Sequence, residues 1–340
     1  MLSSWFPEPT VAPLRGGAVL RWGIVAPGGI ADYFARAVLG HTDQRIVAVA
    51  SRSAERAAAF AARHSIERRY GSYEQLMHDR DVQIVYVAAP HSEHLPLGLQ
   101  AISAGKHVLI EKPMALSAHE AEQIAAAARS AGVLAAEAMW TRYLPQFDVL
   151  NTILERGDLG KIRLATADVG WQMGPDASPR FFDPAQGGGA ALDMGVYGYW
   201  FAQFAIGRPT RVRGVGRMTD TGVDDQAVVA LATSDGGFAS ITTSMAVTNS
   251  GARRSTRHQR VCPVPRYFCV SRPIRCRAQR RHPRMARPEW LADARRARLA
   301  DHRAGPVHRA GHDRLPRPQH QRRHQRPPHH RDRSRPAQSS

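Results

Sequence analysis

Short apolar runs alternate with alanine-rich stretches through residues 20–137, and few folds accommodate this alternation. The runs are apolar enough to be buried on both faces, as the strands of a covered parallel sheet are. Alanine-rich stretches between them are typical of helices that cover such a sheet. The expected strands are 21–26, 46–51, 84–88, 107–111 and 134–137. The expected helices are 30–39, 54–64, 72–78, 94–104 and 117–131. We therefore predict an α/β protein whose first domain, residues 20–140, is a doubly wound parallel sheet of the Rossmann type.

The pattern changes after Pro145. One helix reaches Glu155, and the strands that follow alternate apolar with polar side chains. Such alternation is typical of an open, mainly antiparallel sheet with one solvated face. The expected strands are 161–170, 210–216, 225–233 and 237–245, with a glycine-rich loop and helix at 187–206. We predict that residues 141–250 form a second, α+β domain that binds the substrate.

Positive charge is concentrated in the last ninety residues. The chain carries a formal +18, but residues 251–340 contain 25 Arg, no Lys and five acidic residues, a net +20, which leaves −2 for residues 1–250. One explanation is a frameshift near Gly251 in a GC-rich gene, since Arg, Pro and Ala codons are GC-rich and Lys codons are not. The other is a genuine arginine-rich tail that binds nucleic acid. Neither predicts a folded domain, and a frameshift would leave the second domain incomplete.

Cysteine usage and hydropathy indicate the environment of the protein. All three cysteines lie in the tail, seven residues apart, and this spacing fits neither a metal site nor a C-x-x-C motif. No apolar run reaches the roughly 18 residues of a membrane span. Residues 1–19 begin with a proline-containing, aperiodic stretch, which favours a disordered leader. We expect a cytoplasmic protein with no metal and no membrane partner.

A glycine-rich turn follows the first expected strand and opens the first expected helix. Dinucleotide folds bind the pyrophosphate at this point, because small residues let the amides of the helix N-terminus approach it. The usual G-x-G-x-x-G/A pattern stands here as Ala26-x-Gly28-x-x-Ala31, with alanine for the first glycine. An ordinary tight turn is the alternative. The expected cofactor contacts are Ala26, Pro27, Gly28, Gly29 and Ile30.

The end of the second expected strand indicates which dinucleotide binds. An NAD site usually carries an acidic residue there, for the ribose hydroxyls. This chain has Ser51, Arg52 and Ser53 instead. A carboxylate repels the 2′-phosphate of NADP, whereas an arginine and two hydroxyls can bind it. We predict NADP rather than NAD, with Ser51 and Arg52 as contacts, although Arg52 could simply face solvent.

Three further segments carry polar residues in places suited to chemistry. The fourth expected strand ends in Ala89-Pro90-His91, and His94 follows three residues later. The fifth ends in Glu111-Lys112-Pro113. Ligands of open α/β sheets bind at the carboxyl ends of the strands, where both segments lie. Far downstream, Asp193 and Tyr197 are four residues apart, which places them on one face of a helix.

This combination resembles the glucose-fructose oxidoreductase / inositol dehydrogenase family (Gfo/Idh/MocA). The resemblance is greatest to its trans-dihydrodiol dehydrogenase and NADP-dependent xylose dehydrogenase branch, and it covers about residues 20–250. It rests on the segments GIVAPGGIA at 23–31, ASRS at 50–53, EKP at 111–113, EAMWTR at 137–142 and GGGAALDMGVY at 187–197. The glycine-rich turn is common to many folds, whereas the Glu-Lys-Pro segment with the Asp-x-x-x-Tyr pair is specific.

The resemblance implies an NADP-dependent oxidoreductase that moves a hydride between a nicotinamide and a hydroxyl or carbonyl group of a sugar, polyol or dihydrodiol. Lys112 and Tyr197 would be the catalytic pair, with Asp193 beside them. An ammonium next to a phenol favours the phenolate and so makes it a better base. Trp140 would form a flat apolar wall for the substrate, and Arg142 would donate to its hydroxyls. Further cofactor contacts would be Ala89, Pro90, His91, His94 and Glu111.

Ordinary structural roles are the alternatives for the catalytic residues. Lys112 could be a strand-end lysine, Asp193 a helix cap and Tyr197 a packing residue. Two other functions also stay open: an inactive dinucleotide-binding remnant, and a nucleic-acid-binding protein that acts through its tail. Family members commonly pair through the open sheet, so the resemblance also implies a homodimer if the second domain is complete.

Overall fold

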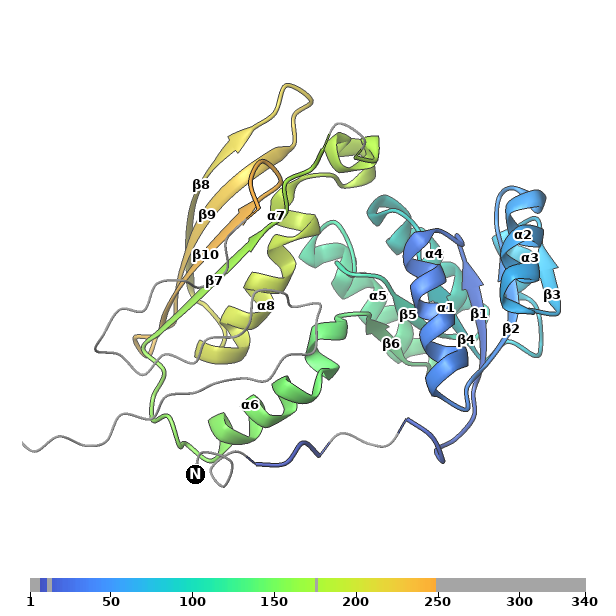
Figure 1. Ribbon diagram of the computed structural model, residues 1–340, viewed down its shortest axis with the longest axis horizontal. Helices are drawn as coiled ribbons and strands as arrows, with labels where there is room; N and C mark the ends of the chain where they lie inside the picture. The colour runs from blue at the N-terminus through green and yellow to red at the C-terminus, as the bar shows by residue number, and fades with distance from the viewer. Residues whose placement is uncertain (1–6, 11–13, 175–176, 249–340) are drawn as a thin grey trace, which may run out of the picture. The chain divides into compact units, whose positions relative to one another are not determined.

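The computed structural model of the chain describes residues 7–10, 14–174 and 177–248 (Figure 1). The arginine-rich tail at 251–340 lies outside the described residues, and so do the frameshift and nucleic-acid hypotheses that concern it. None of the helices in the described ranges combines the length and the apolar character that a membrane span requires.

The first half of the chain forms a six-stranded sheet in which every neighbouring pair is parallel. The strands are β1 Arg21–Val25, β2 Arg45–Ala50, β3 Arg68–Tyr70, β4 Ile84–Val87, β5 His107–Ile110 and β6 Ala135–Glu137. Their order is β3-β2-β1-β4-β5-β6, so the direction of winding reverses between β1 and β4. This confirms the predicted doubly wound sheet, and the reversal is where such sheets bind ligands.

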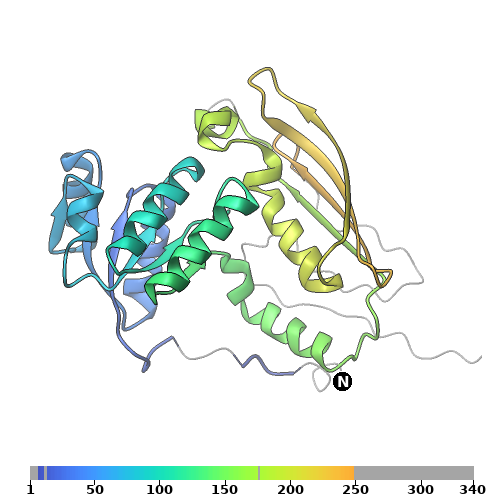
Figure 2. The same ribbon diagram turned by 180° about the vertical axis from the view of Figure 1, so that it is seen from behind.

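Helices cover both faces of this sheet. They are α1 Gly29–His41, α2 Ala54–His64, α3 Tyr73–Met77, α4 His94–Ser103 and α5 Ala118–Ala131, with a 3₁₀ turn η1 at His91–Glu93. Consecutive strand residues point to opposite faces, so Ile24 packs beneath α1 and α2 while Val25 packs beneath α3, α4 and α5. Figure 1 shows α1 in front of the sheet, and the reverse view in Figure 2 brings α4 and α5 to the front.

Serines begin three of these helices. Ser53, Ser72 and Ser117 are the N-caps of α2, α3 and α5, and each hydroxyl accepts the amide three residues on. At α5, the Glu120 carboxylate accepts the amide of Leu116 at 2.9 Å, one residue before the position that the S-x-x-E pattern predicts. Strand β3 was not predicted, because its three residues are polar and too few to show a period.

The second half begins with a 3₁₀ turn η2 at Trp140–Tyr143 and helix α6 at Pro145–Glu155. Its sheet has the order β7-β10-β9-β8, in which only β7 and β10 are parallel, so the predicted mainly antiparallel sheet is confirmed. The strands are β7 Leu164–Gly170, β8 Arg211–Met218, β9 Asp224–Ala232 and β10 Phe238–Ser244. Between β7 and β8 lie η3 Pro179–Phe182, η4 Pro184–Gln186, α7 Ala190–Asp193 and α8 Gly195–Ile206.

Helix α8 covers one face of the second sheet. Ala202 of α8 packs into a buried cluster with residues of β7, β9 and β10, among them Ile241. The helix approaches closely at Gly198, where an added Cβ would lie 2.6 Å from Ile241 Cγ2. The edge strand β8 is exposed at all eight positions. The core of this half therefore lies between α8 and β7, β10 and β9.

Candidate active site

The glycine-rich turn between β1 and α1 has the backbone that a phosphate site requires. Ala26, in place of the first glycine, has a φ of 60°, a left-handed conformation that costs an alanine about 1 kcal/mol. A Cβ added at Gly28 would meet only the Ala26 carbonyl oxygen at 3.9 Å, and one at Gly29 would meet nothing within 4 Å. The amides of the first turn of α1 have no partner within the helix. A pyrophosphate therefore has room to approach them, and the turn fits a dinucleotide.

The serines beside this turn form local hydrogen bonds. Ser51 is buried and its hydroxyl accepts the Ser53 amide at 3.2 Å. Ser53 is the N-cap of α2, and its hydroxyl also donates to Glu55 Oε2 at 2.7 Å. Arg52 is the exposed member of the triplet. Local bonds thus use the Ser53 hydroxyl as both donor and acceptor and the Ser51 hydroxyl as an acceptor, while the Arg52 guanidinium is exposed.

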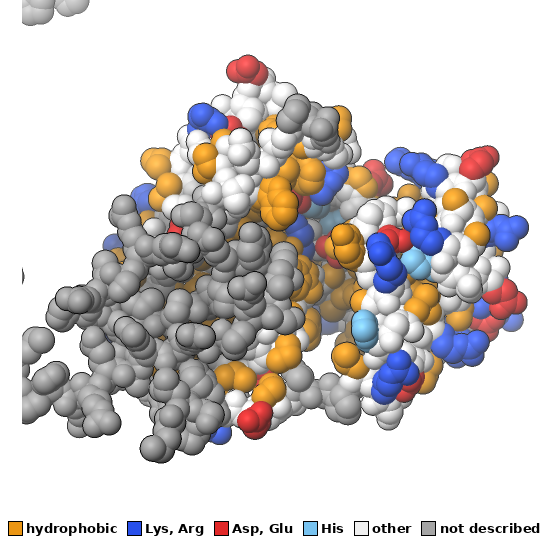
Figure 3. Space-filling view, viewed as in Figure 1, with side chains coloured by type: hydrophobic (Ala, Val, Ile, Leu, Met, Phe, Trp, Pro, Cys, Tyr) orange, Lys and Arg blue, Asp and Glu red, His pale blue; other side chains and the backbone are white. Residues whose placement is uncertain are grey.

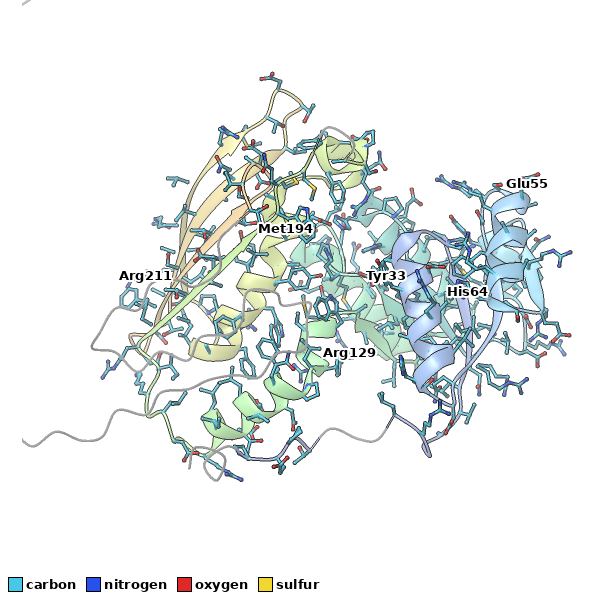
Figure 4. All side chains as sticks on the ribbon, in the orientation of Figure 1. Tyr33, Glu55, His64, Arg129, Met194 and Arg211 are labelled. Carbon is cyan, nitrogen blue, oxygen red and sulfur yellow. The ribbon has the colours of Figure 1, made fainter. Side chains whose placement is uncertain are left out.

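An acidic residue in the first turn of α1 ties this helix to α2. The Asp32 carboxylate accepts His64 Nε2 at 2.8 Å and Arg63 Nη1 at 3.2 Å, and it also pairs with Arg36. Hydrogen bonds, the largest from His64, hold the pKa of Asp32 below its usual value. Figure 4 shows His64 between the two helices, and in Figure 3 basic side chains are prominent on this part of the visible surface.

Lys112 and Asp193 meet although 81 positions separate them in the sequence. Lys112 follows β5, and its Nζ donates to the Asp193 carbonyl oxygen at 2.6 Å and lies 3.3 Å from Asp193 Oδ1. Asp193 ends α7 and Tyr197 lies in the first turn of α8, with Met194, labelled in Figure 4, at the junction. Lys112 Nζ is 5.1 Å from the centroid of the Tyr197 ring. The structure thus brings together the three residues that the sequence singled out for catalysis.

Asp193 is a buried carboxylate among several nitrogen groups. Besides Lys112, its Oδ1 lies 3.4 Å from His91 Nε2 and 3.7 Å from Arg180 Nη1. Burial alone raises the pKa of Asp193, but the bond to His91 and the charges of Lys112 and Arg180 outweigh it. The net result is a pKa far below the usual value for aspartate. The ionised form of Asp193 is therefore favoured, and it can hold the Lys112 ammonium in place.

Trp140 contacts the phenol directly. Its indole Nε1 donates to the Tyr197 hydroxyl at 3.1 Å, and the two rings meet edge to face with centroids 5.9 Å apart. The sequence predicts only a flat apolar wall at this position. Arg142, by contrast, is exposed.

Three consecutive glycines position the segment that carries Asp193. A Cβ on Gly187 would lie 2.8 Å from His91 Cβ, one on Gly188 would lie 2.6 Å from the Phe181 carbonyl oxygen, and one on Gly189 would lie 2.5 Å from Asp224 Oδ1. His91 Nδ1 also contacts the Gly187 carbonyl oxygen at 2.8 Å. Each glycine therefore allows a different close contact, and the loop is fixed on three sides.

Asp224, at the start of β9, supports the same segment. Its Oδ2 accepts the Ala191 amide at 2.8 Å, within the short helix that ends at Asp193. On the neighbouring strand β10, the Thr243 hydroxyl donates to the Ala190 carbonyl oxygen at 3.0 Å. The position of Asp193 relative to Lys112 thus depends on strands β9 and β10.

Two acidic residues, the buried Glu111 and the partly buried Glu137, lie near Lys112. Glu111 Oε1 accepts the Tyr86 hydroxyl at 2.6 Å, and its Oε2 accepts the Lys112 amide at 3.1 Å. Glu137 Oε1 accepts the Met114 amide at 2.8 Å. Burial raises the pKa of both carboxyl groups. These bonds fix the chain on either side of the cis peptide between Lys112 and Pro113.

His94 has no exposed surface. Its Nδ1 lies 2.7 Å from the Pro113 carbonyl oxygen and its Nε2 lies 3.0 Å from that of Ala89. Burial lowers the pKa of His94 to about 4, so at neutral pH it is uncharged and donates to one of the two carbonyls. In this conformation His94 joins the ends of β4 and β5 from beneath and offers no surface to a ligand.

Comparison with protein families decides the identity of this arrangement. A model described as the oxidoreductase family with an NAD-binding Rossmann fold matches residues 20–138, and the GFO/IDH/MocA C-terminal domain matches residues 147–258. The trans-1,2-dihydrobenzene-1,2-diol dehydrogenase of Mus musculus is 40% identical over 230 residues, which cover 66% of this chain and 68% of that protein. The chain belongs to the Gfo/Idh/MocA family. A nicotinamide dinucleotide is therefore its cofactor.

Further Gfo/Idh/MocA comparisons agree with this membership. The Homo sapiens trans-1,2-dihydrobenzene-1,2-diol dehydrogenase is also 40% identical, over 62% of this chain and 64% of that protein. The chain thus spans about two thirds of the length of these relatives. KijD10, a 3-ketoreductase from Actinomadura kijaniata solved with NADP and TDP-benzene, is 30% identical with a TM-score of 0.60 over 67% of this chain and 71% of its own. GenD2 from gentamicin A biosynthesis, solved with NAD, is 27% identical with a TM-score of 0.64 over 71% and 70%.

Several site residues of this Gfo/Idh/MocA chain carried too little signal to be found from the sequence. Arg180 and Asp224 each stand in an unremarkable segment, and tertiary contacts bring them to Asp193 and α7. Glu137 opens the EAMWTR segment, but the sequence gives no sign of its proximity to Lys112. For Asp224, the adjacent pair with Asp225 at the start of a strand is the one available hint. Within the described ranges, no group of three or more His, Cys, Asp or Glu residues could hold a metal ion.

Proposed function

We propose that this chain is an NADP-dependent dehydrogenase or reductase that interconverts a hydroxyl and a carbonyl group on a sugar, polyol or dihydrodiol. One observation carries the proposal: the Lys112 ammonium is bound to Asp193 and stands 5.1 Å from the Tyr197 ring. A cation, a fixed anion and a phenol at this spacing suit the transfer of a proton to or from a substrate oxygen.

Arg52 supports NADP over NAD. It is exposed at the end of β2, where an NAD site would carry an acid, and no carboxylate stands at positions 51 to 53. Arginine binds phosphate through two parallel hydrogen bonds. The pyrophosphate would lie against the amides that follow Gly28, and His91 and Glu111 would border the nicotinamide end.

The nicotinamide, when bound, supplies the acceptor or donor of hydride. During oxidation, Tyr197 takes the proton of the substrate hydroxyl as the C–H bond breaks and the carbonyl forms. Lys112 favours the phenolate by its charge and can donate to the substrate oxygen. Asp193 keeps Lys112 in position, because it binds the ammonium through both its carbonyl and its carboxylate.

The names of the relatives suggest the substrate class. The trans-1,2-dihydrobenzene-1,2-diol dehydrogenase of Mus musculus is 40% identical to this chain over 230 residues. An aldose-aldose oxidoreductase from Caulobacter crescentus, complexed with glycerol, is 26% identical with a TM-score of 0.63. The dihydrobenzenediol, the aldose and the glycerol in these names all carry hydroxyl groups on neighbouring carbon atoms. Trp140 would contact the carbon face of such a substrate, and Arg142 would have to turn inward to reach its hydroxyls.

Replacing Tyr197 with phenylalanine tests the proposal. We expect turnover of a polyol and dihydrodiol panel to fall roughly 10²- to 10⁴-fold, because the group that moves the proton is gone. NADP affinity, measured by nicotinamide fluorescence, should stay within about twofold of the unmodified protein, since the phosphate turn is untouched. The measurement is the rate of NADPH formation.

Tyr73→Phe, at the start of α3, is the matched control and should retain full activity. If Tyr197→Phe turns over normally, Tyr197 has no role in the proton transfer. Tight NADP binding with no turnover by the unmodified chain on any panel compound would indicate an inactive dinucleotide-binding remnant.

A further inference from the structure

We propose that the indole N–H of Trp140 tunes the acidity of the Tyr197 hydroxyl, and that Trp140 is thereby part of the catalytic machinery as well as a wall of the site. The inference rests on the proposed function, in which Tyr197 exchanges the substrate proton. It deepens that function, because it names a group that sets the pH at which the phenol can act as a base.

The geometry places the indole at the reacting oxygen. Trp140 Nε1 donates to the Tyr197 hydroxyl at 3.1 Å, within normal hydrogen-bond distance. Both side chains are partly buried, so water competes weakly for this bond. An apolar wall would need only the face of the indole, yet here the edge-to-face arrangement points the N–H at the oxygen.

The backbone fixes the indole relative to Lys112. The Ala138 amide donates to the carbonyl oxygen of Ile110, the last residue of β5, at 2.7 Å, and the Trp140 amide donates to Ala138 at 2.9 Å. The positions of Trp140 and Lys112 are therefore both fixed by the carboxyl end of β5. Tyr197 comes from α8, so the indole N–H links the turn that follows β6 to α8 at the phenol.

The physical effect follows from the kind of donor. An indole N–H donates only and keeps its proton, so it binds an ionised phenolate more strongly than a neutral phenol. Hydrogen bonds to charged acceptors are stronger than those to neutral ones, and the difference corresponds to roughly 0.5 to 1 pKa unit. Trp140 therefore moves the pKa of Tyr197 downward, toward the pH at which a general base is effective.

Other groups around Tyr197 also act on its ionisation. Among the described residues, the charged and titratable groups at this site include Lys112 and Glu111 after β5, Glu137 on β6, Tyr86 on β4, His91 on η1, Arg180 on η3 and Asp193 on α7. Replacing Trp140 with phenylalanine leaves every one of them in place. A change in the ionisation of Tyr197 in that variant therefore reports on the indole N–H.

The test is the pH dependence of kcat/KM for NADP-linked oxidation of a neutral polyol. In Trp140→Phe we expect the limb that rises with pH to move upward by roughly 0.5 to 1 unit. One unit below the original midpoint, kcat/KM should then fall about three- to tenfold, and well above both midpoints most of it should return. Trp22→Phe also removes an indole hydrogen bond, to Gln44 Oε1 at 3.2 Å, but lies on β1 and should leave the limb unmoved.

A direct titration separates this inference from the proposed function. Carbon-13 labelling of the tyrosine ring carbon that bears oxygen gives the pKa of Tyr197 by NMR, with its signal identified by its absence in Tyr197→Phe. If Trp140→Phe raises KM and leaves the Tyr197 titration unchanged, Trp140 is a wall alone and the inference is wrong. If the titration moves but Tyr197→Phe keeps full turnover, the indole tunes the phenol while the proposed role of Tyr197 fails.

A second variant guards against loss of folding in Trp140→Phe. Placing the benzothienyl analogue of tryptophan at position 140 exchanges the N–H for sulfur and keeps the shape of the ring. The inference requires the same upward movement of the Tyr197 titration in this protein. An unchanged titration here would overturn it.

Discussion

The two halves of the molecule hold their functional residues in different ways. In the parallel-sheet half, Gly28 and Lys112 follow strand ends, and their positions are a consequence of regular strands buried on both faces. In the second half, Asp193 and Tyr197 sit on short helices reached through irregular loops, and the contacts at Gly187, Gly188 and Gly189 fix their positions. Regular structure tolerates small changes at such positions, whereas a loop held by close backbone contacts does not.

Gly188→Ala should have the largest effect among the variants that sharpen this comparison. Its Cβ would lie 2.6 Å from the Phe181 carbonyl oxygen and 2.8 Å from that of Arg180, so the backbone must shift. A displacement of Asp193 by about 1 Å is expected to lower turnover by roughly 10²-fold, while NADP binding is retained. Steady-state kinetics and a fluorescence titration measure the two quantities.

Gly40→Ala is the control for this change. Gly40 lies in α1 and an added Cβ meets nothing within 4 Å, so activity should be unchanged and the helix slightly more stable. Equal turnover in Gly188→Ala and the parent protein would show that the second half tolerates an added side-chain atom as well as the first half does.

Arg52→Glu tests the first half. A carboxylate at the end of β2 should weaken NADP binding by roughly 10- to 100-fold, because a charged hydrogen bond is lost and repulsion of the 2′-phosphate replaces it. Binding of NAD, which lacks that phosphate, should be unchanged or stronger. Arg129→Glu makes the same charge change on α5, away from the turn, and should affect neither. An equal loss of affinity for NADP and NAD would show that the 2′-phosphate does not bind at Arg52.

The smallest expected difference between the two halves is in the free energy of unfolding that a valine-to-alanine change removes. Val85→Ala removes two methyl groups from a side chain with no exposed surface in β4 and should cost about 2 kcal/mol of unfolding free energy. Val215→Ala makes the same change on β8, where the side chain is 75% exposed, and should cost less than about 0.5 kcal/mol. Urea unfolding curves measure both. Similar losses at the two sites would mean that β8 is covered in solution.

Sequence reasoning succeeded where structure is regular. The expected strand at 84–88 is observed as Ile84–Val87, and the expected helix at 54–64 is observed as Ala54–His64, because continuous apolar runs and alanine-rich stretches encode buried strands and their helices. The spacing of Asp193 and Tyr197 predicted one face of a single helix, whereas the structure places Asp193 at the end of α7 and Tyr197 in the first turn of α8. The sequence shows that residues 187–189 are glycines, but their partners His91, Phe181 and Asp224 are tertiary contacts that no local pattern encodes.

Trp140 shows the same limit at a single side chain. Its aromatic character predicted a wall, whereas the direction of its N–H depends on the bend after β6 and on where α8 places Tyr197. Likewise, Ser51 and Arg52 stay predicted cofactor contacts, and the local hydrogen bonds of Ser51 and Ser53 are details that the residue types alone do not specify. The residue type indicates which hydrogen bonds a side chain can form, and the fold decides with which partner it forms them.

A double-mutant cycle on Lys112 and Tyr197 tests the central claim, that these two side chains act as one unit on the substrate proton. The measurement is kcat/KM for NADP-linked polyol oxidation by Lys112→Met, Tyr197→Phe and the double variant. Residues that act together are strongly non-additive, so the double variant should lose about as much as the worse single variant. If the two losses multiply instead, Lys112 and Tyr197 act independently and the account is contradicted.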